Sequence, residues 1–161
     1  MKHRRFHPPA HAAAAKGRLS PRRERLVYAG FAALWLSGAG WLIVRYFLRA
    51  TSEFGELPHP AEAWWLCLHG AAAFFALWLL GVLWPTHVLP AWKSRRRASG
   101  IVLGVIALWL VVSGFLLYYV GAERARMLIA LIHWSVGLVI PLPFLWHALR
   151  GRHAQIPRSE S

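Results

Sequence analysis

Four histidines stand in or at the ends of two long apolar segments, where ionisable side chains are rare and usually functional. His69 and His87 lie near the two ends of the second apolar segment of the chain, and His133 and His147 lie near the two ends of the fourth. The first and third apolar segments contain no histidine. Because an imidazole nitrogen can ligate a metal ion or a haem iron, this placement predicts ligand chemistry inside a membrane.

The depth of these histidines pairs them across the two segments. His69 and His133 each lie six residues inside the expected start of their helix, about 9 Å below the same boundary. His87 and His147 both lie near the opposite boundary. The 18 residues from His69 to His87 equal five helical turns, and the 14 residues from His133 to His147 leave that pair about 40° apart. Each helix therefore offers one histidine at each of two levels.

Two imidazoles that face each other at one level suit a haem, whose iron takes one axial nitrogen from each side. A flat porphyrin between helices needs small neighbouring residues. Gly137 lies one turn from His133, and Gly100 and Gly114 are 14 residues apart and therefore stacked on the third segment. Since small residues also let membrane helices pack closely without a cofactor, these glycines give secondary support.

Two other classes of function stay open. The same histidines could serve a metal-ion transporter or sensor, because imidazole also binds zinc, copper and iron. The four expected spans contain no Asp or Glu between their ends, which counts against a transport site. A membrane scaffold or assembly protein without a cofactor is the other alternative, and it predicts that the histidines can be replaced without loss of a chromophore.

The elements that carry these residues are four apolar segments, at about residues 26–48, 63–84, 100–120 and 127–149. Each has roughly the 20 residues that a helix needs to cross about 30 Å of hydrocarbon. Only 16% of the 161 residues are charged and 57% are hydrophobic. The sequence therefore predicts an all-α, four-helix transmembrane bundle over residues 26–150. The basic segment 1–25 is expected to be a disordered tail, and 151–161 a short second tail.

The net charge of +13 is distributed in a way that indicates membrane topology rather than nucleic-acid binding. Fifteen Lys and Arg residues lie in the two tails and in the loop between the second and third segments, and four lie on the opposite side. Loops on the cytoplasmic side carry such an excess. We therefore expect both termini on the cytoplasmic side of the cell (inner) membrane, with lipid contacts, no nucleic-acid partner, and His69 and His133 at the outer level.

Two histidines on each of two helices, one pair spaced by 14 residues, resemble the haem-bearing core of the cytochrome b family. The small four-helix chain also resembles cytochrome b561-like membrane cytochromes and the cytochrome b subunits of respiratory dehydrogenases, over about residues 26–150. The resemblance implies two haem b groups, one held by His69 with His133 and one by His87 with His147. It further implies electron transfer across or within the bilayer, by a subunit or partner protein rather than a complete enzyme. The partners it suggests are a quinone and a dehydrogenase or c-type cytochrome.

Two features differ from that family. The first segment has no histidine, and the spacing in the second is 18 rather than 14 residues, which adds about 6 Å of helical rise. A single haem at the outer pair therefore stays open. Arg45, near the outer end of the first segment, is a candidate partner for the propionates of an outer haem. The alternative for Arg45 is an interfacial side chain whose charge reaches the lipid headgroups.

Overall fold

The computed structural model of the 161-residue chain describes residues 19–53, 55–92 and 98–153. Its long helices are α2 (Pro21–Phe47), α3 (Ala61–Leu83), α5 (Ala98–Tyr119), α6 (Glu123–Val139) and α7 (Pro141–His153). Shorter elements are strands β1 (Ala50–Ser52) and β2 (Gly55–Leu57), a π-helical turn (Trp84–Val88) and α4 (Leu89–Trp92). The predicted tails lie largely outside the described residues, although positions 21–25 belong to α2 and positions 151–153 to α7.

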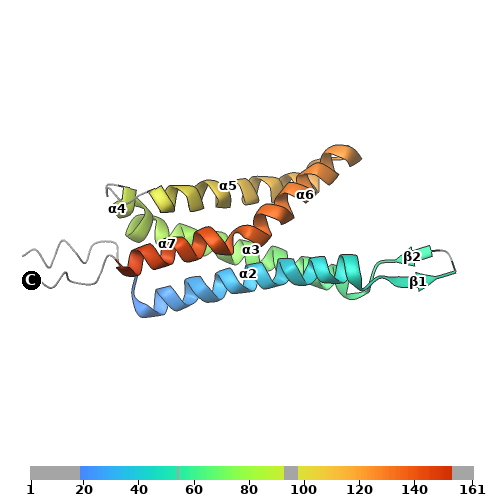
Figure 1. The fold of residues 1–161 in the computed structure, drawn as a ribbon, viewed down its shortest axis with the longest axis horizontal. Coiled ribbons are helices and arrows are strands. Elements are labelled where there is room, and N and C mark those ends of the chain that lie inside the picture. Colours follow the sequence, from blue (N-terminus) through green and yellow to red (C-terminus); the bar gives the residue numbers. More distant parts are fainter. Residues whose placement is uncertain (1–18, 54, 93–97, 154–161) are drawn as a thin grey trace, which may run out of the picture.

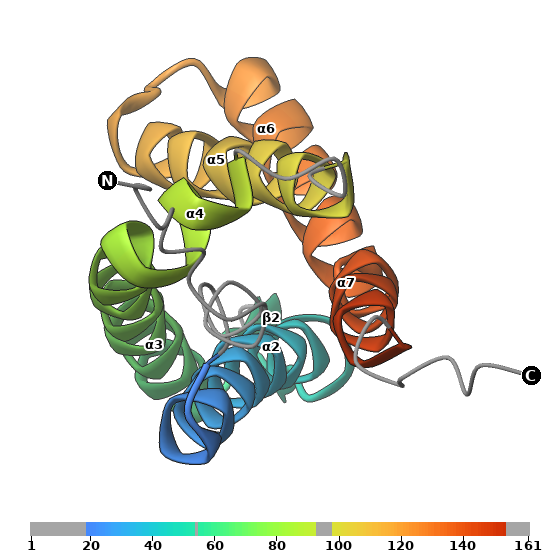
Figure 2. The ribbon, with the colours of Figure 1, turned by 90° about the vertical axis from the view of Figure 1, so that its left-hand side faces the viewer.

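The long helices run side by side along the molecule, and the β1–β2 hairpin projects from one end (Figure 1). The beginning of α2 and the end of α7 are both at the other end of the molecule (Figure 1). Viewed along the bundle, α2, α3, α5 and the α6–α7 pair surround a common axis (Figure 2). The predicted all-α four-helix bundle is confirmed.

Four spans are long and apolar enough to cross a membrane: Pro21–Phe47, Ala61–Trp92, Ala98–Tyr119 and Glu123–Gly151. Large apolar side chains cover their outer surfaces, including Trp64, Phe74 and Leu108, which are 79%, 77% and 64% exposed. An apolar surface of this extent requires an apolar solvent. The chain is a multi-pass membrane protein.

The first helix begins earlier than the sequence pattern predicts. Ser20 is its N-cap, and the Ser20 hydroxyl accepts a hydrogen bond from the backbone N–H of Arg23. Pro21 occupies the first helical turn, where its missing N–H costs no intrahelical bond. These two local signals start α2 about one turn before residue 26, within the segment that was expected to be a disordered tail.

The second and fourth spans depart from regular α-helix at prolines. The second span does not end at Trp84, because the chain continues through the π-helical turn that contains Pro85 and His87. The fourth span is interrupted at Ile140, immediately before Pro141, where α6 gives way to α7. A proline inside a helix removes a backbone donor and its ring displaces the preceding turn. The π-helical turn contains His87, and the break at Ile140 lies between His133 and His147.

Each histidine-bearing span packs along a span without histidine: α3 along α2, and α6 and α7 along α5. Two glycines of α2 allow its close approach to α3. A Cβ atom on Gly30 would lie 2.8 Å from Leu79, and one on Gly40 would lie 2.5 Å from the Trp65 ring. Van der Waals packing of this kind holds membrane helices together, since lipid is as apolar as their side chains.

Aromatic residues join α2 to the fourth span near its break. The rings of Phe31 and Phe144 stack with centroids 4.0 Å apart. The indole N–H of Trp35 donates a hydrogen bond of 3.3 Å to the carbonyl of Leu138 on α6. These contacts fix α2 against both halves of the broken span.

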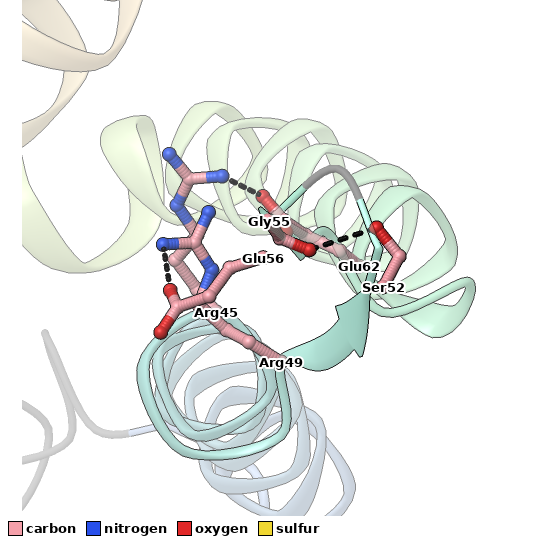
Figure 3. A network of polar contacts seen from close by, with 6 residues as sticks. All are labelled: Arg45, Arg49, Ser52, Gly55, Glu56 and Glu62. Carbon is pink, nitrogen blue, oxygen red and sulfur yellow. Dashed lines mark hydrogen bonds and ion pairs between the residues drawn. The ribbon is translucent and has the colours of Figure 1, made fainter.

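The hairpin between α2 and α3 is held by polar contacts (Figure 3). Strands β1 and β2 pair antiparallel, and Gly55 turns the chain with a φ of 107°, a conformation that glycine adopts without steric cost. The Ser52 hydroxyl donates to the Gly55 carbonyl at 2.8 Å, and Arg49 forms an ion pair of 2.9 Å with Glu56. We refer to this side of the molecule as the hairpin end.

Close packing at Gly40 can be tested by substitution. Gly40→Ala is expected to lower the thermal unfolding temperature in detergent, because the added methyl group would overlap the rigid Trp65 ring. Gly104→Ala on α5 is the matched control, since a Cβ there meets nothing within 4 Å. Alanine is the better helix former by up to about 1 kcal/mol, so the control should unfold at the same temperature or higher. Equal unfolding temperatures for the two variants would contradict the close α2–α3 contact.

Candidate functional site

The structure brings together the histidines in two pairs. The rings of His69 on α3 and His133 on α6 have centroids 6.4 Å apart and planes at 86°. The rings of His87, in the π-helical turn, and His147 on α7 have centroids 6.1 Å apart and planes at 88°. These are the two pairs that the sequence predicted to share a level. The histidines are 18 residues apart on the second span and 14 apart on the fourth. His87 and His147 nevertheless lie close to each other.

The separation of the rings suits a shared metal atom. Two imidazole nitrogens that ligate one metal from opposite sides lie about 2.0 Å from it, which places the ring centroids roughly 6.3 Å apart. The centroid distances of 6.4 and 6.1 Å agree with this value. Within the described ranges, no cluster of three or more His, Cys, Asp or Glu side chains could hold a metal ion. Each pair therefore offers two protein ligands.

Three of the histidines lie against a buried serine. The Ser37 hydroxyl oxygen is 3.2 Å from Nδ1 of His69, and the Ser113 hydroxyl oxygen is 2.8 Å from Nδ1 of His133. The third contact joins Ser99 to Nδ1 of His147 at 3.1 Å. These serines are only 1–4% exposed and are the buried polar residues of the described chain. They come from α2 and α5, the spans against which the histidine-bearing helices pack.

A glycine follows each of these serines and leaves room for the imidazole ring. A Cβ atom on Gly38 would lie 3.0 Å from Cε1 of His69. On Gly114 it would lie 3.4 Å from Cε1 of His133, and on Gly100 it would lie 3.5 Å from Cε1 of His147. The rings thus rest directly on the backbone of the neighbouring helix.

Some of these neighbours were predicted from the sequence and others were missed. Gly100 and Gly114 were predicted, and both adjoin histidines, whereas a Cβ atom on Gly137 would lie 3.9 Å from the Leu110 side chain. Gly38 and the three serines were missed. A signal was present in the sequence, because the chain has three Ser-Gly dipeptides and two of them are 14 residues apart, as are His133 and His147.

Arg45 lies at the hairpin end, where the structure gives it a carboxylate partner. Its guanidinium forms an ion pair of 2.9 Å with Oε1 of Glu62, at the start of α3 (Figure 3). The other oxygen of this carboxylate and the indole nitrogen of Trp41 are buried without a hydrogen-bond partner among the described residues. Trp41 lies one helical turn from Ser37 towards the hairpin. It was missed by the sequence analysis, since burial of its N–H depends on the tertiary packing.

Comparison with protein-family models, with curated proteins and with solved structures finds no match to this chain. A function is therefore inferred from the geometry of the two histidine pairs.

The ion pair between Arg45 and Glu62 can be measured with a double-mutant cycle. Arg45→Ala, Glu62→Gln and the double variant should give a coupling free energy of about 0.5–1 kcal/mol in detergent unfolding, because the Arg45 side chain is 39% exposed and partly screened. The control is the same cycle on Arg49 and Glu56, which have the same separation of 2.9 Å but a carboxylate that is 61% exposed. The control coupling should be smaller. A larger coupling for the exposed pair would show that Glu62 is not held as described.

Proposed function

We propose that this chain is a membrane cytochrome with two haem b groups, one held by His69 and His133 and the other by His87 and His147. The observation that carries the proposal is the presence of two imidazole pairs, with ring centroids 6.4 and 6.1 Å apart, inside a bundle of helices long and apolar enough to span a membrane. Both separations are those expected of two axial ligands on one metal atom.

The number of ligands favours haem over a bare metal ion. A porphyrin supplies four nitrogen ligands to its iron and leaves two axial positions, which two imidazoles complete. A structural zinc ion generally takes four protein ligands, and the described residues offer two at each level. The glycine positions beside three of the rings also fit a haem site, since they let ligand-bearing helices lie close to their neighbours without displacing the imidazoles.

When bound, a haem iron supplies one-electron chemistry by alternating between its ferric and ferrous states. The side chains of this protein hold and orient the axial nitrogens, and the apolar bundle excludes water from them. The two levels are offset along the fourth span by 14 residues, from His133 on α6 to His147 on α7. Two redox sites in series along a transmembrane bundle suit electron transfer from one face of the membrane to the other.

The charge distribution supports an orientation with both termini in the cytoplasm and the hairpin end outside. Fifteen of the nineteen Lys and Arg residues belong to the segments assigned to the cytoplasmic side. At the hairpin end, Arg45 and Arg49 are each paired with a glutamate. The His69–His133 pair then forms the outer site of a cell (inner) membrane protein. By resemblance to respiratory cytochrome b subunits, the electron partners proposed are a quinone and a dehydrogenase or c-type cytochrome.

The haem content of the purified protein tests the proposal directly. Protein expressed with adequate haem supply and purified in detergent should show a reduced-minus-oxidised spectrum of b type, with about two haems per chain. The haem is quantified against protein concentration. One haem per chain would show that only one of the two sites binds haem. A folded protein without haem would contradict the proposed function.

Histidine substitutions should remove the haems in pairs. His69→Ala and His133→Ala are each expected to abolish the same spectral component, and His87→Ala and His147→Ala the other, because each iron loses one of its two axial ligands. His59→Ala is the matched control. The His59 ring lies in the segment before α3 and accepts a hydrogen bond from the Ala61 backbone at 3.1 Å, so both haems should remain. Retention of the full haem content in His87→Ala would contradict the second site.

A further inference from the structure

We propose that Ser37, Ser113 and Ser99 are positioning residues, which hold the histidines beside them with Nδ1 protonated and Nε2 free to ligate a metal. The inference rests on the proposed haem function. It adds a set of residues that fix the tautomer, the orientation and the ligand strength of three of the four axial imidazoles.

The tautomer of His69 follows from its two neighbours. Nδ1 lies 3.2 Å from the Leu34 carbonyl oxygen and 3.2 Å from the Ser37 hydroxyl oxygen. A carbonyl oxygen can only accept a hydrogen bond, and the Ser37 hydroxyl donates its own hydrogen to the same carbonyl at 2.9 Å. Nδ1 must therefore carry the hydrogen, which leaves the lone pair on Nε2.

Nδ1 of His133 also lies against a serine hydroxyl. The Ser113 hydroxyl donates to the Trp109 carbonyl at 2.7 Å, with a second contact to the Leu110 carbonyl at 3.2 Å. A hydroxyl has one hydrogen, and we assign it to the Trp109 carbonyl, which leaves the Ser113 oxygen as the acceptor for Nδ1 of His133 at 2.8 Å. With this assignment, both histidines of the His69–His133 pair have the tautomer that a metal bound at Nε2 requires.

Repetition of the motif argues for a shared role. A serine in a membrane helix can satisfy its hydroxyl on its own helix without any histidine nearby. Here each of the three Ser-Gly dipeptides of the chain places its serine 2.8–3.2 Å from Nδ1 of a histidine on another helix. The following glycine admits the ring edge at the same place. Ser99 occupies the equivalent position beside His147, and we assign it the same role at the second site.

The hydrogen bond from Nδ1 affects the metal because it makes the imidazole a stronger electron donor. A stronger donor stabilises ferric more than ferrous iron and lowers the midpoint potential. Loss of the serine oxygen should therefore move the potential of the corresponding haem to a more positive value. The effect at Ser113 should exceed that at Ser37, because His69 retains the Leu34 carbonyl as an acceptor.

The test is a spectroelectrochemical titration of the full-length, haem-loaded protein. Ser113→Ala is expected to change the oxidised-to-reduced ratio of the His69–His133 haem about tenfold at a fixed potential, a positive shift of about 59 mV. Ser37→Ala should shift the same haem less, and Ser99→Ala should shift only the other haem. Ser135→Ala, at a serine of α6 outside these contacts, is the matched control. In Ser113→Thr, which keeps a hydroxyl, the His69–His133 haem should have the wild-type midpoint potential.

The outcomes separate this inference from the proposed function. Wild-type protein without haem overturns the proposed function and everything that rests on it. Wild-type protein with two haems whose potentials do not change in the three alanine variants overturns this inference alone. Loss of haem in Ser113→Ala with retention in Ser113→Thr supports the role of the hydroxyl. Loss in both variants would show that the position acts through packing, and would overturn the inference.

Discussion

The need to satisfy every polar group in hydrocarbon constrains the whole arrangement of this bundle. An imidazole ring has two nitrogens, and a buried nitrogen without a partner costs several kcal/mol in an apolar medium. The protein meets this constraint at one nitrogen of three histidines with a buried serine from the adjacent helix. Each of these contacts ties a histidine-bearing span to a span without histidine, so it constrains both the pairing of the helices and the orientation of the ring.

The packing of the helices is organised around these contacts. Spans with histidines alternate with spans that carry the Ser-Gly dipeptides, and each histidine-bearing span packs on a neighbour without histidine. Glycine at the second position of the dipeptide lets the ring touch the neighbouring backbone, so the serine oxygen reaches Nδ1. At Gly38 even a Cβ atom would crowd the His69 ring at 3.0 Å, whereas at Gly114 and Gly100 it would lie in ordinary contact at 3.4 and 3.5 Å. Small residues in these helices therefore lie both at close helix contacts and beside the imidazole rings.

The two spans with different histidine spacings each contain an irregular turn between or at the histidine levels. A strictly α-helical second span would place His87 about 6 Å further along its axis than a 14-residue spacing would. The π-helical turn holds more residues in a turn than an α-helix, and the break at Ile140 allows α7 to follow a different direction from α6 (Figure 1). With these departures the rings of His87 and His147 lie 6.1 Å apart. Prolines at positions 85 and 141 mark both departures in the sequence, but not the direction in which each helix turns.

Apolar length and histidine spacing were sufficient to predict four spans and the two histidine levels, because each depends on local periodicity and on the fixed rise of a helix. The same local patterns failed at the start of α2, where Ser20 and Pro21 extend the helix, and at Trp84, where the span continues. They also did not reveal the serines beside the histidines or the partner of Arg45. Those contacts join residues 17 to 48 positions apart, and they depend on how each helix is rotated about its own axis. Such rotation is set by side-chain packing between helices, so only the tertiary structure decided which polar groups meet.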